Sequence, residues 1–144
     1  MGAANAVSLA KQEGQIIQLQ QKISDLQMEV KMVTMMTERK KRVLEALRTA
    51  VAYYGYDMDA LMATKCRERT IADLRAIVWT IYQEETKYST SQLSVDFGWN
   101  RCTIFTAVKR AKELRSLDRN FCDIYDSIND AFNNVLIFNN NYYV

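Results

Sequence analysis

The chain has 144 residues and a net charge of +2, with 49% hydrophobic and 25% charged residues, which is ordinary for one folded domain with an appendage. It contains no histidine, so no Ser-His-Asp or Cys-His catalytic arrangement is possible and the commonest metal ligand is missing. The three cysteines form no CxxC pair, and neither GxxxxGK nor GxGxxG is present to hold a phosphate. We therefore expect no enzyme activity, no metal site, no cofactor and no small-molecule substrate.

Residues that break helices are scarce, because there is no proline and there are only four glycines. A β-sandwich or barrel needs many tight turns, so the predicted fold class is all-α. Charged residues interrupt every apolar stretch well before the roughly 18 residues that a membrane span requires. Residues 1–9 lack the basic start of a secretory signal, and three widely spaced cysteines suit a reducing compartment. We expect a cytoplasmic protein of a bacterium or of a phage-infected host cell, with no membrane partner.

Residues 1–38 have the pattern of a coiled coil that forms a homodimer. Apolar side chains alternate at spacings of three and four residues over about four heptads. The side chains that we expect in the dimer seam are Leu9, Ile16, Leu19, Ile23, Leu26, Val30 and Val33. β-Branched residues predominate at position a and leucine recurs at position d, which favours a parallel two-stranded coil. The alternative is a single amphipathic helix that packs onto its own domain.

No terminator separates this helix from an apolar stripe that continues to Val51, so we expect one long helix that runs into the globular part and ends at Gly55. The further predicted helices cover residues 57–63, 71–85, 89–97, 101–117 and 120–135. Their expected capping residues are Thr70, Ser89 or Thr90, Gly98 and Asn100. The predicted organisation is a coiled-coil helix at 1–38, a globular domain at 39–135 and a tail at 136–144 to which we assign no structure.

The segment from Thr90 to Arg110 predicts a helix-turn-helix. A short helix is followed by a glycine and then by a longer helix whose first turn is polar and basic. The side chains spaced to face a shared core are Leu93, Phe97, Ile104, Phe105 and Val108. The residues left at the exposed start of the second helix are Asn100, Arg101, Cys102 and Thr103. A recognition helix presents its reading residues to the major groove of DNA at this position.

Four segments make this prediction more specific: Val51-Ala-Tyr-Tyr, Lys65-Cys-Arg-Glu-Arg-Thr-Ile-Ala-Asp-Leu-Arg-Ala-Ile, Ser89-Thr-Ser-Gln-Leu-Ser-Val-Asp-Phe-Gly and Cys102-Thr-Ile-Phe-Thr-Ala-Val. In this order and spacing they resemble the C-terminal duplex-binding domain of the DnaA replication initiator family, from about residue 40 to residue 130. The resemblance implies a Trp-repressor-like helix-turn-helix domain that binds double-stranded DNA. We find no counterpart of the family's ATPase module, so we expect no initiator activity.

The resemblance also implies a DNA-binding basic loop. Carried over by position, this loop falls on Lys65, Arg67 and Arg69, and Arg75 lies in the helix that follows. In the family an arginine of this loop enters the minor groove, a role that the resemblance gives to Arg69. A narrow minor groove concentrates negative potential and suits arginine. Two separate stretches carry the positive charge, because residues 36–75 hold nine basic and six acidic residues and residues 100–119 hold six and two.

The first turn of the recognition helix departs from the family's usual Asp-His followed by Thr-Thr or Ser-Thr, and only Thr103 is kept. Arg101 can form two hydrogen bonds with guanine, Asn100 can form two with adenine, and Cys102 would read mostly by shape. We therefore expect a target sequence different from that of the family. Lys109 and Lys112, three residues apart on the same helix, are candidates for phosphate contacts.

These observations favour a dimeric, sequence-specific DNA-binding protein, either a regulator or a replication accessory of a phage or mobile element. Double-stranded DNA and a second copy of the chain are its expected partners. The alternative is a structural or interaction protein, such as a virion or scaffold component, that keeps the fold but has lost DNA binding. The altered recognition turn, the modest net charge and three acidic residues without a basic one in residues 120–144 favour this alternative.

Overall fold

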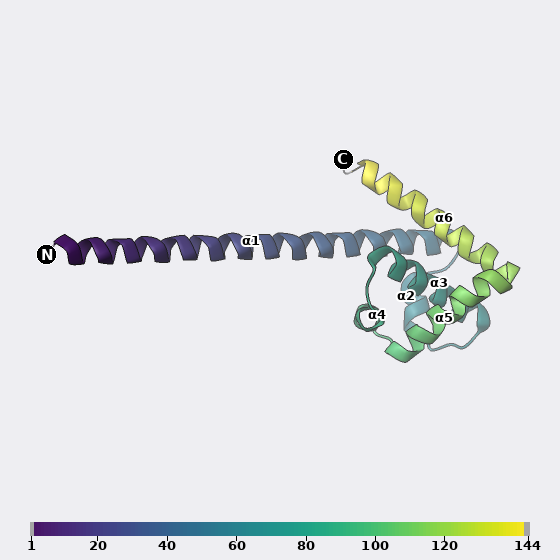
Figure 1. The fold of residues 1–144 in the computed structure, drawn as a ribbon. Helices are drawn as coiled ribbons and strands as arrows, with labels where there is room; N and C mark the ends of the chain where they lie inside the picture. Colours follow the sequence, from purple (N-terminus) through teal and green to yellow (C-terminus); the bar gives the residue numbers. More distant parts are fainter. Residues whose placement is uncertain (1, 143–144) are drawn as a thin grey trace. The chain divides into compact units, whose positions relative to one another are not determined.

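The computed structural model describes residues 2–142, with side chains described for residues 8–138. The described helices are α1 (Gly2–Tyr53), α2 (Met58–Ala63), α3 (Arg69–Thr86), α4 (Thr90–Phe97), α5 (Arg101–Leu117) and α6 (Arg119–Tyr142) (Figure 1). No strand occurs among the described residues, which confirms the predicted all-α class. The chain divides into an N-terminal unit, residues 1–38, and a globular unit, residues 39–144.

The N-terminal unit consists of helix, and α1 continues beyond it to Tyr53 without a break, as the sequence predicts. The seven predicted seam side chains, from Leu9 to Val33, are each between 53% and 65% exposed. All other described side chains between residues 8 and 38 are exposed as well. The apolar stripe is therefore available to a second helix, and dimerisation itself stays a prediction. None of the helices described in residues 2–142 is long and apolar enough to cross a membrane.

Side-chain caps account for the starts of α2, α4 and α5 in the globular unit. The carboxylate of Asp57 accepts a hydrogen bond from the backbone N–H of Ala60 and begins α2. Ser89, rather than Thr90, caps α4, and Asn100 caps α5. Such caps satisfy backbone donors that have no partner within the helix. Gly98 ends α4 at a φ of +69°, in the left-handed region that favours glycine.

The prediction that Thr70 caps the third helix is wrong. α3 begins at Arg69, and its N-cap position belongs to Glu68, whose side chain makes no capping hydrogen bond. No side-chain cap therefore specifies this start. The far end of α3 is also unexpected, because Lys87 ends the helix at a φ of +61°, which a residue other than glycine rarely adopts.

α3 is the central helix of the globular unit and packs against α2, α4, α5 and α6. Its buried residues include Leu74, Ile77, Trp79 and Tyr82. The last part of α1 belongs to the same core through Leu47 and other side chains one helical turn apart. This packing fixes the position of α5, the predicted recognition helix, because its buried face lies against α3.

Two expectations are corrected, one about the buried face of α5 and one about the length of α6. Phe105 is 60% exposed, whereas Ile104 and Val108 on the same helix are buried. Residues 104, 108 and 111 share one face of α5, and Phe105 lies about 100° around the helix from Ile104. α6 is longer than expected and continues to Tyr142 instead of ending near residue 135, so it includes most of the predicted tail.

A buried acidic group joins α1 to α4 within the globular unit. The side chain of Asp96 is 1% exposed and forms an ion pair with Lys40. Its oxygens also accept hydrogen bonds from the hydroxyl of Tyr82 at 2.6 Å and from the amide of Gln92 at 3.0 Å. Burial and then Asp96 raise the pKa of the Tyr82 hydroxyl. A buried charge with partners of this kind stabilises one arrangement of the helices.

We predict that Asp96→Ala lowers the free energy of unfolding by about 3 kcal/mol, because it leaves Lys40 and the Tyr82 hydroxyl without their buried partner. Asp59→Ala is the matched control, since it removes an exposed pair with Arg48 (2.6 Å) and is expected to cost less than about 1 kcal/mol. Urea unfolding of both variants and the unaltered protein at equal chain concentration measures the difference. Equal losses in the two variants would contradict the role given to Asp96.

Candidate nucleic-acid interface

The segment from α4 to α5 has the geometry of a helix-turn-helix. The two helices pack against each other, and Leu93 and Ile104 contribute buried side chains to the core beneath them. The turn is fastened by the hydroxyl of Ser94, which donates a hydrogen bond to the carbonyl oxygen of Trp99 at 2.6 Å. Gly98 and the cap at Asn100 then set the direction in which α5 begins. The local sequence thus fixes both the turn and the start of the second helix.

The first turn of α5 exposes the side chains of Arg101, Cys102 and Thr103. Arg101 has one long hydrogen bond, 3.4 Å from its Nη1 to the hydroxyl oxygen of Ser91. Asn100 is committed to the cap, because its side-chain oxygen accepts a hydrogen bond from the N–H of Cys102 at 2.8 Å. A paired contact between Asn100 and adenine would require this cap to open. Arg101 is therefore the better placed of the two for reading a base.

The loop between α2 and α3 exposes Lys65 and Arg67, whereas Arg69, which the sequence also assigns to the loop, is the exposed first residue of α3. Arg75 differs from them, because it is only 6% exposed. Its guanidinium donates hydrogen bonds to the carbonyl oxygens of Thr64 at 2.7 Å and Cys66 at 2.8 Å. Arg75 thus holds the shape of the loop from inside, and the structure does not give it the exposed position expected of a DNA contact.

Trp99 connects this loop to the helix-turn-helix. Its indole Nε1 donates a hydrogen bond to the carbonyl oxygen of Met62 at 2.8 Å. The ammonium of Lys65 lies 3.8 Å from the centre of its ring, and the guanidinium of Arg75 lies 4.6 Å from it. Cations at these distances are attracted to the ring face. This role could not be inferred from the sequence, because the partners of Trp99 lie far from it along the chain.

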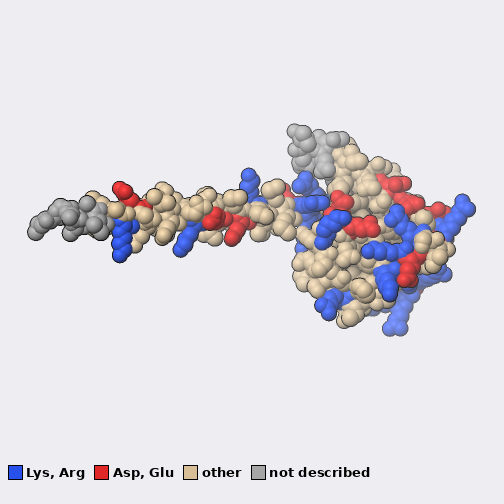
Figure 2. All heavy atoms as spheres, viewed as in Figure 1, with Lys and Arg blue, Asp and Glu red and all other residues tan. Residues whose placement is uncertain are grey.

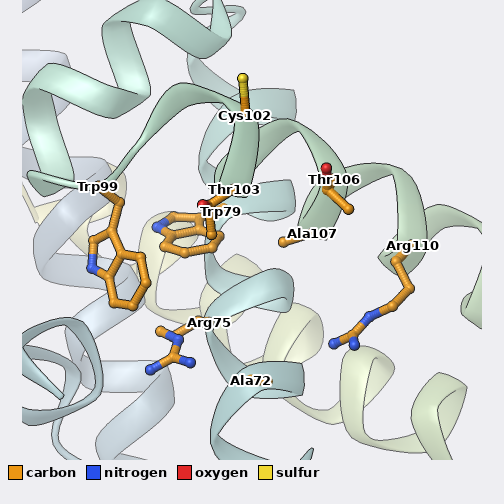
Figure 3. A pocket seen from close by; sticks show the side chains of 9 residues that line it. All are labelled: Ala72, Arg75, Trp79, Trp99, Cys102, Thr103, Thr106, Ala107 and Arg110. Carbon is orange, nitrogen blue, oxygen red and sulfur yellow. The ribbon is translucent and has the colours of Figure 1, made fainter. Parts of the chain in front are cut away.

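A hollow of about 430 Å³ lies between α3 and α5, beside Trp99. Its lining residues are Ala72, Arg75, Trp79, Trp99, Cys102, Thr103, Thr106, Ala107 and Arg110 (Figure 3). The walls therefore combine one face of α3 with one face of α5, and Trp99 stands beside them. The Nε1 of Trp79 is buried and has no hydrogen-bond partner among the described residues. This donor is sealed from solvent, so it offers nothing to a ligand in the hollow. The ring of Trp79 makes an edge-on contact with the ring of Trp99, with 5.4 Å between the ring centres, and this contact stands in for the missing hydrogen bond.

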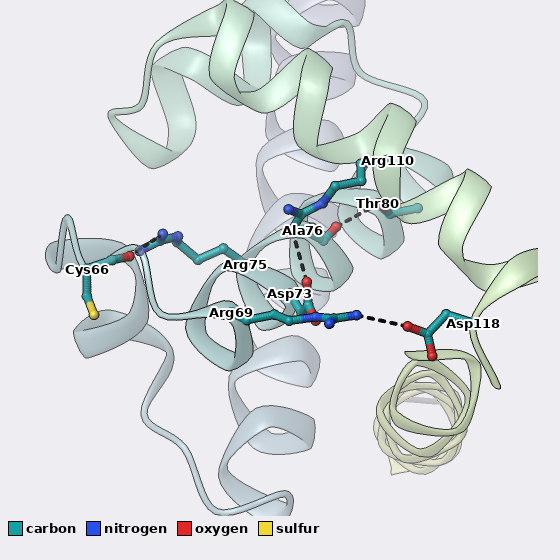
Figure 4. A network of polar contacts seen from close by, with 8 residues as sticks. All are labelled: Cys66, Arg69, Asp73, Arg75, Ala76, Thr80, Arg110 and Asp118. Carbon is teal, nitrogen blue, oxygen red and sulfur yellow. Dashed lines mark hydrogen bonds and ion pairs between the residues drawn. The ribbon is translucent and has the colours of Figure 1, made fainter. Parts of the chain in front are cut away.

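Two aspartates hold arginines on the same side of the globular unit (Figure 4). Arg69 forms an ion pair with Asp118 at 3.0 Å, and its Nε lies 3.8 Å from Asp73. Arg110 forms a closer pair with Asp73 at 2.9 Å. Burial raises the pKa of the Asp73 carboxyl, and the charges of Arg110 and Arg69 oppose that shift. Neither aspartate was singled out from the sequence as part of this surface.

Lys109 and Lys112 are exposed on α5, but they line a different depression from the one that contains Arg75. Their neighbours there are Gln83, Thr90 and the exposed ring of Phe105. The structure thus places the first turn of α5 at one hollow and leaves the two lysines on another flank of α5. Figure 2 shows acidic side chains interspersed among the basic ones on the face in view.

The chain matches no protein-family model, no curated protein and no solved structure in the comparisons with known proteins. The similarity to the DnaA duplex-binding domain therefore rests on the four sequence segments alone. No group of three or more cysteine, aspartate or glutamate side chains that could hold a metal ion occurs in the described part of the chain.

We predict that Arg75→Met loosens the basic loop, because the carbonyl oxygens of Thr64 and Cys66 lose their donor and Trp99 loses a cation. Trypsin should then cleave after Lys65 or Arg67 at least several-fold faster, as followed by mass spectrometry of the fragments. Lys109→Met is the control, since it removes one positive charge without touching the loop. A cleavage rate at the loop that is the same in both variants would show that Arg75 does not hold it.

Proposed function

We propose that the protein binds double-stranded DNA as a homodimer, with one helix-turn-helix per chain. The observation that carries the proposal is the exposed first turn of α5 together with an exposed basic loop, which Trp99 links to the turn before α5 through its contacts with Lys65 and Met62. Two cationic elements linked in this way suit a duplex, which offers two grooves separated by a phosphate backbone. The resemblance of residues 40–130 to a duplex-binding domain supports the same proposal.

In the proposed complex the start of α5 enters the major groove. The guanidinium of Arg101 then lies within reach of base edges, where it donates two hydrogen bonds to guanine O6 and N7. Thr103 and Cys102 complete the reading surface with a hydroxyl and a small sulfur-containing side chain. Lys109 and Lys112, farther along α5, contact phosphates and add affinity without sequence preference.

The basic loop occupies the adjacent minor groove in this proposal. Lys65, Arg67 and Arg69 are exposed, and the internal hydrogen bonds of Arg75 fix the loop backbone beneath them. A loop ordered before binding loses less conformational entropy on DNA than a mobile one. Arg69 is the side chain that we assign to the groove itself, where narrow A·T-rich stretches attract arginine.

The apolar stripe of the N-terminal unit is the proposed dimer seam. Its exposed side chains repeat at heptad spacing, and a second copy of α1 would bury them. The globular unit of each chain is then one DNA-binding head. Two heads linked by the coiled coil bind two half-sites with an affinity that neither head reaches alone. A regulator, or a replication accessory of a phage or mobile element, is the biological role that fits a dimeric DNA-binding protein without an enzyme site of its own.

A second candidate function is that of a structural or interaction protein which keeps this fold without binding DNA. The ion pairs of Arg69 and Arg110 with aspartates favour it, because they neutralise positive charge on the surface in question. The two functions predict different behaviour with DNA. A protein of the second kind would fail to shift random duplex in a gel at low salt and micromolar concentration.

We predict that Arg101→Ala and Lys109→Ala weaken DNA binding in different ways. A target sequence is first selected from a random duplex pool, and binding is then measured by fluorescence anisotropy at several salt concentrations. Arg101→Ala should lower the preference for the selected site by about 10-fold, because guanine loses its paired contact. Lys109→Ala should weaken all duplexes alike and make the salt dependence less steep. Similar loss of preference in both variants would contradict the assigned roles.

We predict that Leu26→Asp makes the protein monomeric, because it places a charge in the dimer seam. Met28→Asp is the matched control, since Met28 is equally exposed in one chain but lies outside the seam positions. Analytical ultracentrifugation measures the mass of each variant. The control should remain dimeric, whereas a monomeric unaltered protein, or equal behaviour of the two variants, would rule out the proposed coiled coil.

A further inference from the structure

We propose that Asp118 tunes the DNA affinity of this protein by competing with the duplex for Arg69. This inference rests on the proposed DNA-binding function. Arg69 is the residue assigned to the minor groove, and its guanidinium lies 3.0 Å from a carboxylate oxygen of Asp118 (Figure 4). A guanidinium held by a carboxylate has to give up that partner before it can enter a groove.

The position of Asp118 is fixed by a second contact. Its Oδ1 accepts a hydrogen bond from the backbone N–H of Phe121 at 3.2 Å, in the first turn of α6, while its Oδ2 accepts from Arg69. The residue lies directly between α5 and α6, and its own N–H bonds to the carbonyl of Leu114. The carboxylate therefore stands at a rigid junction and does not follow Arg69 when that side chain moves.

Asp118 is a better competitor than Asp73, the other carboxylate near Arg69. Asp73 is 12% exposed and already has a closer partner in Arg110, 2.9 Å away, so it stays neutralised when Arg69 leaves. Asp118 is 28% exposed, and the ion pairs described for it involve Arg69 alone. When Arg69 moves to DNA, Asp118 is left as a negative charge beside the phosphate backbone. Both the lost pair and the new repulsion oppose binding.

The side chain of Arg69 can exchange Asp118 for the duplex. Its side chain is 75% exposed, and no aromatic ring contact is described for it. The competition is therefore between two partners of similar chemistry, a carboxylate in the protein and the anionic groove of the duplex. Exposed ion pairs of this kind are weak, so the effect of Asp118 on the dissociation constant should be about two- to fivefold.

The test compares Asp118→Asn with Asp59→Asn in the full chain. Asparagine keeps an oxygen for the cap at Phe121 but cannot accept from Arg69 as a carboxylate does. Asp59→Asn makes the same change in net charge at a distant pair, where Asp59 lies 2.6 Å from Arg48. Asp118→Ser is a second neutral capping variant, in case the amide disturbs the junction. Each of the three variants is measured alone and in combination with Arg69→Ala. Thermal unfolding first shows that the fold is intact, and binding to a random duplex is then measured by fluorescence anisotropy.

We expect Asp118→Asn to bind two- to fivefold more tightly than Asp59→Asn when Arg69 is present, and to keep only a smaller advantage when Arg69 is replaced, because the repulsion between Asp118 and the phosphates then remains without the competing ion pair. Equal affinities in the presence of Arg69, or weaker binding by both neutral variants at residue 118, would overturn the inference and leave the proposed function standing. If none of the proteins, including the unaltered one, binds duplex at micromolar concentration and low salt, then the proposed function fails and the inference fails with it.

Discussion

The candidate interface depends above all on the buried guanidinium of Arg75. It bonds to two carbonyl oxygens of the basic loop and lies over the ring of Trp99, the residue between Gly98 and the cap of α5. One side chain from the central helix therefore sets both the loop and the turn of the helix-turn-helix. Burial lowers the pKa of Arg75 from its ordinary value, which is the electrostatic cost of this position. Hydrogen bonds to carbonyls and the aromatic face offset that cost.

Local features of the sequence were enough to predict the helices and the turn. The caps at Ser89 and Asn100 and the left-handed glycine at Gly98 act within a few residues, so they can be read from the chain itself. The start of α3 could not be read in this way, because no side chain caps it. The misplacement of Phe105 has a similar origin, since helical spacing alone does not say how wide the buried face of α5 is.

The contacts that shape the candidate site were beyond prediction for a different reason. The hydrogen bond from Trp99 to Met62 and the ion pair between Arg110 and Asp73 each join residues 37 positions apart, and the Arg69–Asp118 pair spans 49. Nothing in a periodic pattern specifies such pairs. The carboxylate of Asp73 restrains Arg110 in this way. The exposed basic residues could be listed from the sequence, but their partners could not.

The electrostatics of the globular unit and the proposed dimer are connected. If the proposed function holds, acidic partners lower the affinity of a single head for DNA, because part of its positive charge is already neutralised by ion pairs. A weak head makes firm binding depend on two heads acting together through the coiled coil, since the second contact is then made at a high effective concentration. Such a protein binds DNA weakly through one head alone, and it binds random duplex weakly. In the proposed function, the aspartates beside the arginines therefore make dimerisation a condition for occupying a site rather than an addition to an already tight monomer.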